Sequence, residues 1–323
     1  MTTTNEFRRF DVASDDSDHH YGGSGNNNIT RNTKKSIMKE WKTLEKNLPE
    51  SIYVRVYEQR IDLMRAVIIG AAGTPYHDGL FFFDIAFPSD YPNHPPKVHF
   101  ISFGLRLNPN LYTSGYVCLS LLNTWTGKKN ELWDPSVSTC LQLLISLQGL
   151  VLNEKPYFNE PGSDTLGRFL VNGSSRSYSE YVYGLTCKLN LHLLWRPPKN
   201  FEAFVKSHFR DRAVVILTAF TEYANGRERI GYYSADTSSS RPRKHRVSRT
   251  YKRWMLEVYP LMVDAFEGCG ASLDTSLRSL VLLSESKSKK ISTIWTKAMA
   301  QIKNAFTWKK KNNRKEITRE TSA

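Results

Sequence analysis

Three apolar runs follow one another at short spacing in the first third of the chain and limit the folds available to it. Residues 53–57 alternate in character, and residues 63–69 are apolar and rich in β-branched side chains near their end. Residues 80–87 are too uniformly apolar for a half-exposed strand, and residues 97–100 form a shorter run. Such runs at hairpin spacing predict antiparallel strands. We therefore expect an antiparallel meander sheet of about four strands.

Helical patterns on both sides of these strands place the chain in the α+β class. Residues 36–48 carry apolar side chains at helical spacing, and Pro49 ends that helix. Asp134 and Pro135 have the composition of a helix start, and residues 201–223 are amphipathic. A further helix is expected over residues 177–194. The inner face of the helix after Pro135 is predicted to consist of Val137, Leu141, Leu144, Ile145 and Gln148.

Composition divides the chain into six stretches. Segments rich in Asp, Gly and Asn near the N-terminus, and in Ser and Arg near residue 240, bury too little apolar area to fold alone. The expected organisation is a disordered N-terminal tail over 1–33, a folded core over 34–200, a post-core amphipathic helix over 201–234, a basic linker over 235–254, a helical extension over 255–307 and a basic tail over 308–323.

The 323-residue chain has a net charge of +14, and two basic blocks carry much of the excess. They cover residues 241–253 and 309–315. Such blocks are typical of solvated tails that meet acidic partners or act as nuclear import signals, and an exposed linker without a specific partner fits as well. We expect no membrane partner, because no run of 18–20 apolar residues is present. The expected location is the cytoplasm, the nucleus or both.

The four cysteines are widely spaced and form no CxxC pair, which argues against a metal knuckle or a disulfide framework. Each is therefore a buried apolar residue or a working thiol. Cys118 lies in an irregular stretch rich in Pro, Asn and Gly, shortly after Gly115. Cys140 and Cys187 fall in predicted helices, and Cys269 lies between two glycines. These surroundings select Cys118 as the working thiol.

Four motifs around Cys118 occur in the order found in the ubiquitin-conjugating enzyme family. They are a proline-rich element with Pro88, Tyr91, Pro92, Pro95 and Pro96, the tripeptide Asn108-Pro109-Asn110, the Gly-x-Val-Cys site at 115–118, and the element Trp133-Asp134-Pro135. The chain resembles this family over residues 36–195. Its long connection between Trp125 and Trp133 is similar to the branch that contains the large hybrid conjugating enzyme–ligases and the plant phosphate-homeostasis conjugating enzyme.

The resemblance implies the ubiquitin-conjugating fold, with residues 34–200 as the catalytic core. It implies that Cys118 accepts ubiquitin as a thioester from the ubiquitin-activating enzyme and transfers it to a lysine of a protein substrate. A ubiquitin ligase is a further expected partner, with ligase-like autonomy as the alternative. We expect no intrinsic cofactor and no metal, because the activating enzyme consumes the ATP of the pathway.

The resemblance also implies roles for three residues near Cys118. Asn110 would stabilise the oxyanion that forms when a lysine attacks, as amide donors do in acyl transfer, or would brace the loop. Glu160 stands where family members carry an acidic residue beside the active site, and an exposed loop carboxylate is the alternative. Asn108 replaces the family's histidine, and this departure concerns loop geometry more than chemistry.

Two loops inherit the family's contacts with ligases, and plain surface loops are the alternative. Their residues are His94, Pro95, Pro96 and Lys97 in the first loop and Asp134, Pro135 and Ser136 in the second.

Other functions fit the sequence less well. An inactive family variant would lack the cysteine. A nucleic-acid-binding protein is disfavoured, because the basic blocks occur without a helix-turn-helix, zinc module or stacking motif. A thiol hydrolase would need an order of Cys, His and Asn residues that is not apparent.

Overall fold

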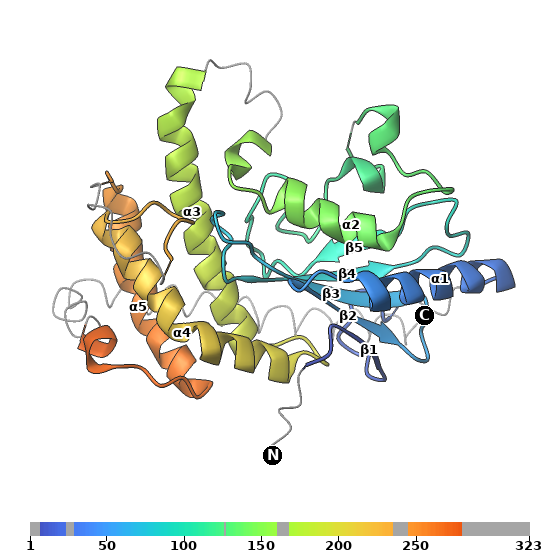
Figure 1. Cartoon of the computed structure of the whole chain (residues 1–323), viewed down its shortest axis with the longest axis horizontal. Coiled ribbons are helices and arrows are strands. Elements are labelled where there is room, and N and C mark those ends of the chain that lie inside the picture. The colour runs from blue at the N-terminus through green and yellow to red at the C-terminus, as the bar shows by residue number, and fades with distance from the viewer. Residues whose placement is uncertain (1–6, 24–28, 126, 160–167, 235–244, 280–323) are drawn as a thin grey trace, which may run out of the picture. The chain divides into compact units, whose positions relative to one another are not determined.

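A five-stranded sheet forms the centre of the molecule (Figure 1). The computed structural model describes residues 7–23, 29–125, 127–159, 168–234 and 245–279. The strands stand in chain order across the sheet: β1 Phe10–Ala13, β2 Ile52–Tyr57, β3 Leu63–Ile69, β4 Leu80–Ala86 and β5 Lys97–Phe100. Strands β2 to β5 pair antiparallel with one another, with Val54 opposite Ala66 and Phe83 opposite Phe100. The α+β class and the meander are therefore confirmed.

Strand β1 corrects the prediction that residues 1–33 form a disordered tail. Phe10 pairs in parallel with Val54, and the Val54 N–H donates to the Arg9 carbonyl at 2.6 Å. A parallel pairing with a strand far along the chain leaves no hairpin signal in the local sequence. Residues 7–23 are therefore folded onto the sheet, and the rest of the predicted tail up to residue 28 lies outside the described residues.

One face of the sheet carries a row of polar side chains, one on each strand from β2 to β5. The row consists of Arg55, Arg65, Asp84 and His99, which face one another in register. The N-terminal segment covers this row. Asp18 lies 2.7 Å from the Arg65 guanidinium, and the His20 ring stacks on the His99 ring with centroids 3.5 Å apart. Polar contacts thus help to attach this segment to the sheet, together with aromatic contacts such as that of Phe7 with Tyr53.

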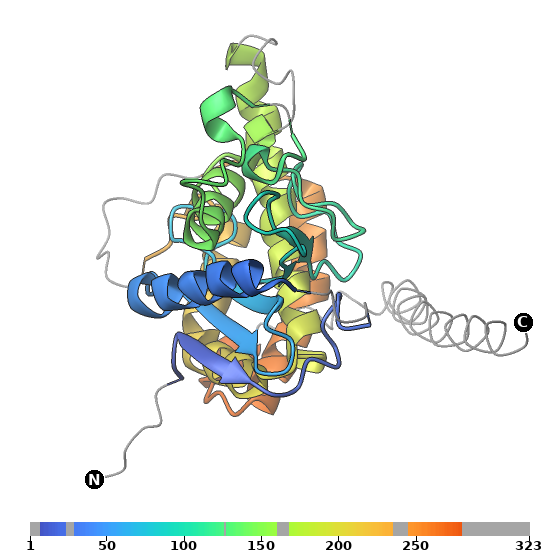
Figure 2. The same cartoon turned by 90° about the vertical axis from the view of Figure 1, so that its right-hand side faces the viewer.

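Helix α1 (Arg31–Asn47) lies across the strands, as Figure 2 shows. It begins earlier than the predicted range of 36–48, because the Thr30 hydroxyl accepts a hydrogen bond from the Thr33 N–H at 3.1 Å. A threonine in this position caps the otherwise unpaired amides of a first helical turn. The buried side chains of α1 are Thr33, Ile37, Glu40, Trp41 and Leu44.

Helix α2 (Cys140–Ser146) begins later than the predicted start at Asp134 and Pro135. The Asp134 carbonyl instead closes a turn by accepting from the Ser138 N–H at 2.8 Å. The helix cap is Thr139, whose hydroxyl accepts from the Gln142 N–H while the Gln142 amide oxygen accepts from the Thr139 N–H. This reciprocal cap sets the start of the helix.

The later start changes which side chains of α2 face inward. Of the predicted inner face, Leu144 is buried, whereas Val137 is 65% exposed and Ile145 is 46% exposed. The chain then continues as a π-helix, Leu147–Val151, which shifts the phase again because more residues fill each turn. The buried side chains of this region are Cys140, Leu143, Leu144, Leu147 and Val151.

Three further helices pack against one another beside the sheet (Figure 1). They are α3 (Arg168–Trp195), α4 (Glu202–Asn225) and α5 (Arg249–Gly268). Helix α5 approaches α3 so closely that a Cβ atom on Gly184 would lie 1.1 Å from the Trp254 ring. Phe209 of α4 stacks on Phe266 of α5 with ring centroids 6.0 Å apart. None of the helices among the described residues is long and apolar enough to cross a membrane.

The predicted boundaries of the C-terminal part need two changes. Helix α5 begins at Arg249, inside the predicted basic linker of 235–254. It belongs to the compact unit that ends at Ser272, so it is not a separate extension. The second unit is described over residues 273–279, and the remainder of the predicted extension and the basic tail, residues 280–323, lie outside the described residues.

Candidate active site

The chain leaves β5 and folds back along it before it reaches Cys118. The Phe100 N–H donates to the Gly115 carbonyl at 2.7 Å, and Tyr116 forms a bridge with His99. Gly115 has a φ of +86°, and a Cβ atom there would lie 2.1 Å from the His99 ring. A glycine is therefore needed for both the conformation and the close approach. This return brings Cys118 to the edge of the sheet.

Cys118 is held by its neighbours in this return and is 5% exposed. Its N–H donates to the Asn110 carbonyl at 2.9 Å, and its thiol donates to the Thr124 carbonyl at 3.1 Å. Burial raises the pKa of the Cys118 thiol, and a hydrogen bond with the Tyr112 hydroxyl opposes this increase. The site therefore favours the neutral thiol over the thiolate.

The other three cysteines lie in or directly after helices. Cys140 begins α2 and Cys187 lies within α3, and both are buried; burial raises the pKa of both thiols, that of Cys187 to about 12. Cys269 follows α5, and its thiol donates to the Phe266 carbonyl at 3.0 Å. The prediction that Cys140 and Cys187 are packing residues is confirmed. Cys118 is the one cysteine of the four that lies beside side-chain amides in an irregular segment.

The Asn110 side chain lies directly beside Cys118. Its Nδ2 atom donates to the Cys118 carbonyl at 3.0 Å, and its N–H donates to the Asn108 Oδ1 atom at 2.8 Å. The structure thus brings together Cys118 and the predicted amide donor. In this arrangement the amide braces the backbone of the cysteine.

Asn108, which stands where the family has histidine, is fully buried and serves as the hub of the loop. Its Nδ2 atom donates to the Tyr76 hydroxyl at 2.8 Å and to the Val151 carbonyl at 2.7 Å. Its Oδ1 atom accepts from the Asn110 N–H and, at 3.3 Å, from the Asn159 side chain. A buried amide with all of these partners holds the loop as a structural residue would. The replacement of histidine therefore leaves the loop well connected.

Comparison with known proteins identifies the family. A family model described as ubiquitin-conjugating enzyme matches residues 36–184. The putative ubiquitin-conjugating enzyme E2 39 of Arabidopsis thaliana is 54% identical over 233 residues, which cover 68% of this chain and 71% of that protein. The chain belongs to the ubiquitin-conjugating enzyme family.

Other relatives are much longer than the chain. The probable ubiquitin-conjugating enzyme E2 23 of Arabidopsis thaliana is 49% identical over 82% of this chain and 24% of that protein. The dual E2 ubiquitin-conjugating enzyme/E3 ubiquitin-protein ligase BIRC6 of Homo sapiens is 36% identical over 74% of this chain and 5% of that protein. The chain spans 24%, 29% and 37% of the length of the plant relatives E2 23, E2 24 and E2 25. The similarity to the branch of hybrid conjugating enzyme–ligases is confirmed.

The two loops predicted to contact a ligase are joined to each other through the residues that flank them. The Trp133 indole N–H donates to the Pro92 carbonyl at 2.7 Å. Glu40 of α1 links the same regions, because its carboxylate accepts from the Tyr91 hydroxyl at 2.7 Å and from the Cys140 N–H at 3.0 Å. Burial raises the pKa of the Glu40 carboxyl.

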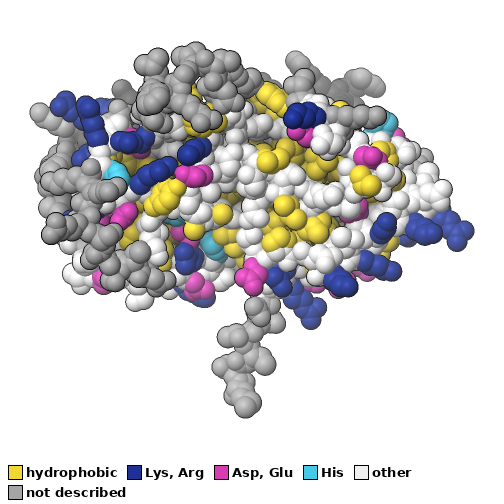
Figure 3. Space-filling view, turned by 45° about the horizontal axis from the view of Figure 1, so that its top comes forward, with side chains coloured by type: hydrophobic (Ala, Val, Ile, Leu, Met, Phe, Trp, Pro, Cys, Tyr) yellow, Lys and Arg dark blue, Asp and Glu magenta, His cyan; other side chains and the backbone are white. Residues whose placement is uncertain are grey.

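The seven residues predicted to contact a ligase differ in exposure. His94, Lys97, Asp134, Pro135 and Ser136 are exposed, Pro95 is half-buried and Pro96 is buried. Pro96 thus supports its loop from inside. Val137 adds an exposed apolar side chain next to the second loop. Figure 3 shows hydrophobic side chains in the middle of the face that it draws. Contact with a ligase stays a prediction.

Glu160 lies outside the described residues. The chain is described up to Asn159, whose amide contacts Asn108, so the residue that precedes Glu160 belongs to the active-site network. The role of Glu160 stays a prediction.

Three residues of this site were not singled out by the sequence: two contact Cys118 and the third contacts Asn108. They are Tyr112, Thr124 and Asn159. The sequence carries no local signal for these three residues, because their positions depend on the folded loop.

Proposed function

We propose that this protein is an active ubiquitin-conjugating enzyme that carries ubiquitin as a thioester on Cys118 and transfers it to a lysine amine of a protein substrate. The observation that carries the proposal is the placement of Cys118 at the sheet edge with the Asn110 amide on its carbonyl. Membership of the family over residues 36–184 supports it.

Two exchanges make up the proposed reaction. In the first, the Cys118 thiol loses its proton to solvent and the thiolate attacks the thioester between ubiquitin and the ubiquitin-activating enzyme; the cysteine of the activating enzyme leaves as a thiolate and regains a proton. In the second, a lysine amine attacks the new thioester, an amide bond forms, and the Cys118 sulfur leaves and regains a proton. A cysteine is nucleophilic enough near neutral pH to exchange thioesters without a dedicated base. ATP is consumed by the activating enzyme, so this chain needs no resident cofactor.

Asn110 is the proposed donor to the oxyanion of the second exchange. Its Nδ2 atom already lies 3.0 Å from the Cys118 carbonyl, so a small rotation would present it to an oxygen next to the Cys118 sulfur. Donors in this role accelerate acyl transfer because they are fixed before charge develops. Glu160 is the proposed carboxylate that helps the attacking lysine lose its proton.

A ubiquitin ligase is the proposed partner of the loops at His94–Lys97 and Asp134–Ser136. Their joined arrangement, with exposed polar residues and the exposed Val137, supports a surface for a protein partner. The alternative is that the protein transfers ubiquitin without a separate ligase. Similarity to one dual conjugating enzyme and ligase, over 5% of the length of that protein, supports this alternative.

A pulse–chase assay tests the proposed function. The protein is charged with activating enzyme, ATP and labelled ubiquitin, the activating enzyme is then stopped, and free lysine is added with or without a ligase. We expect a reductant-sensitive adduct on a non-reducing gel that disappears as ubiquitin-lysine forms. Absence of any reductant-sensitive adduct would contradict the proposal, and discharge without a ligase would support autonomy.

A further inference from the structure

The chain turns back on itself directly after Cys118. A 3₁₀-helix, η1 (Ser120–Leu122), is followed by Asn123 with a φ of +56°. This left-handed residue reverses the chain, and the Thr124 N–H then donates to the Leu119 carbonyl at 3.3 Å. The reversal brings Thr124 next to Cys118, although six positions separate them in the sequence.

The Thr124 hydroxyl holds the backbone on both sides of Cys118. It lies 2.9 Å from the Val117 carbonyl and 3.2 Å from the Leu119 carbonyl, and it accepts from the Leu119 N–H at 2.9 Å. A hydroxyl is the smallest side-chain group that can donate and accept at once. Valine has the same shape as threonine but can do neither.

The Thr124 backbone holds the thiol itself. Its carbonyl accepts the Cys118 thiol hydrogen at 3.1 Å. Because the hydroxyl fixes the peptide that carries this carbonyl, loss of the hydroxyl would also loosen the acceptor of the thiol.

We propose that Thr124 is a positioning residue for the proposed reaction: its hydroxyl clamps the backbone around Cys118, and its carbonyl sets the direction of the thiol. This inference rests on the proposed role of Cys118. The thiol can donate to Thr124 only while it carries a hydrogen. The contact therefore belongs to the uncharged protein, and it is lost when the sulfur is ionised or bonded to ubiquitin.

Two influences act on the proton of this thiol. Burial raises the pKa of the Cys118 thiol, and the hydrogen bond with the Tyr112 hydroxyl opposes this increase. Among the described residues, Tyr112 is the titratable side chain that bears on the Cys118 thiol. An acceptor carbonyl adds to the preference for the neutral thiol, because a thiolate has no hydrogen to donate.

The test is the alkylation of Cys118 by iodoacetamide between pH 6 and pH 10, followed by mass spectrometry of the Cys118 peptide. It uses the wild type, Thr124→Val, Thr124→Ser and the control Thr218→Val, which removes a single hydroxyl bond to Val214 on α4. For the wild type we expect a midpoint above the value of about 8.5 for a free cysteine. Thr124→Val should lower the midpoint and raise the rate at pH 7 about fivefold, as expected for the loss of about one hydrogen bond. Thr124→Ser and Thr218→Val should follow the wild type.

A charging assay with ubiquitin should show the opposite change in rate. Thr124→Val should charge about fivefold more slowly. Without the hydrogen bonds of the Thr124 hydroxyl, the Cys118 thiol is accessible to a small reagent but poorly aligned with a thioester. Thr124→Ser should restore the rate.

Alkylation needs no ubiquitin, so it tests Thr124 even if another residue carries the modifier. A Thr124→Val profile identical to that of the wild type would overturn the proposal. If Thr124→Val unfolds, as simultaneous alkylation of all four cysteines would reveal, Thr124→Ala, which also lacks the hydroxyl, takes its place: a midpoint below that of the wild type supports the proposal, and an identical profile overturns it.

Discussion

Two segments with little regular secondary structure, residues 14–23 and residues 104–133, are held in place by different chemistry. The first is held by charged and titratable groups on the sheet: Asp18 pairs with Arg65, and the His20 N–H donates to the Asp84 carboxylate at 2.7 Å. The second is held by the neutral side chains of Asn108, Asn110, Thr124 and Trp133, which bond mainly to backbone atoms.

This difference separates a fixed part of the fold from an adjustable one. A buried charge that loses its partner leaves a cost of about 3–5 kcal/mol, whereas a neutral hydrogen bond contributes about 1 kcal/mol. The N-terminal segment should therefore be fixed to the sheet and sensitive to pH. The active-site segment should be equally stable at pH 5.5 and pH 7.5 and able to rearrange at small cost.

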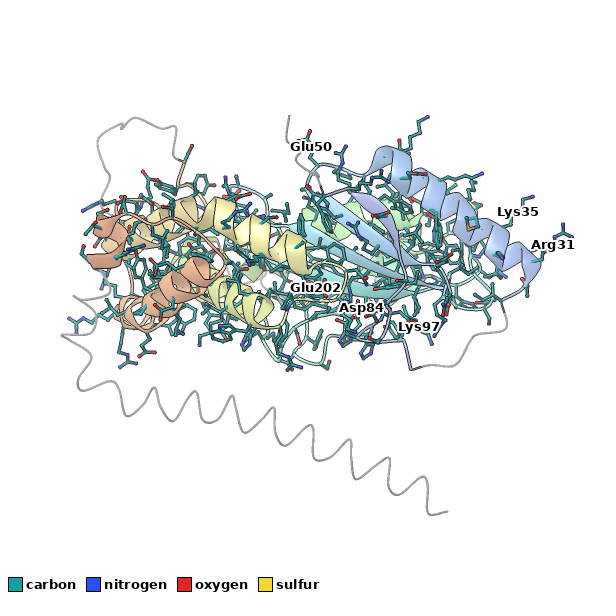
Figure 4. All side chains as sticks on the ribbon, turned by 90° about the horizontal axis from the view of Figure 1, so that it is seen from below. Arg31, Lys35, Glu50, Asp84, Lys97 and Glu202 are labelled. Atoms are coloured by element: carbon teal, nitrogen blue, oxygen red, sulfur yellow. The ribbon has the colours of Figure 1, made fainter. Side chains whose placement is uncertain are left out.

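The largest effect is expected from Asp84→Ala, which breaks the charged anchor of the first segment. The Asp84 carboxylate lies 2.6 Å from the Arg65 guanidinium, whose side chain has no exposed surface, and Figure 4 shows Asp84 between the labelled Glu202 and Lys97. Its loss leaves Arg65 with Asp18 as its remaining ion-pair partner among the described residues. We expect the free energy of unfolding to fall by about 3–5 kcal/mol in chemical denaturation.

Asp211→Ala is the matched control. Asp211 pairs with Arg210 at 2.8 Å on the surface, so its removal should change the free energy of unfolding by less than about 1 kcal/mol. Equal losses of stability in the two variants would contradict the comparison, because the buried ion pair on the sheet would then contribute no more than an exposed one.

Asn110→Ala should have the next largest effect, on the chemistry rather than the fold. Discharge to free lysine should slow by about 10²–10³, while charging changes much less, because the proposed oxyanion forms beside this amide. Asn47→Ala removes an exposed amide that donates to the Thr43 carbonyl and is the control. An equal loss of charging and discharge would assign Asn110 to bracing alone.

Asn108→Ala should weaken the hub of the active-site segment. The variant removes one of the two side-chain donors to the Val151 carbonyl and the acceptor of the Asn110 N–H, so we expect a loss of about 1–3 kcal/mol in the free energy of unfolding. The loss should be the same at pH 5.5 and pH 7.5, because the partners are neutral. A loss that grows toward low pH would contradict the assignment of neutral chemistry to this segment.

The smallest expected effect is the pH dependence carried by His19. Its ring lies 3.0 Å from the Met64 carbonyl, and burial lowers its pKa below the usual 6.5. The unfolded chain then binds more protons than the folded one below pH 6.5, so stability falls as the pH falls from there toward the folded pKa. Between pH 7.5 and pH 5.5, His19→Gln should lose about 1 kcal/mol less stability than the wild type.

Part of the pH dependence should persist in this variant, because burial also lowers the pKa of His192 and of His208. If His19→Gln has the same pH-dependent stability as the wild type, protonation of His19 does not make the N-terminal segment sensitive to pH.

The sequence predicts well those elements whose signals are local. Short apolar runs place β2 to β5 close to their observed bounds, because each strand pairs with its neighbour in the chain. The prediction of the start of α2 is wrong, and the reason is also local. Asp134 and Pro135 have the right composition, but the reciprocal cap of Thr139 and Gln142 determines the start.

The features that the sequence did not predict depend on contacts between residues far apart in the chain. Residues 7–23 contain few apolar side chains, and the row that orders them is distributed over four strands, so no window of sequence reveals it. In the site, motif order selects Cys118 and Asn110. The place of Thr124 depends on the left-handed turn at Asn123, which the sequence does not announce.

The central claim, that Cys118 carries ubiquitin, is tested most directly by charging the Cys118→Ser protein and measuring the adduct by intact mass before and after reductant. We expect the wild type and Cys269→Ser to form an adduct that reductant removes, because Cys269 is bonded to the end of α5 and away from the site amides. Cys118→Ser should form a reductant-stable oxyester or no adduct. A reductant-sensitive ubiquitin adduct on Cys118→Ser would contradict the account.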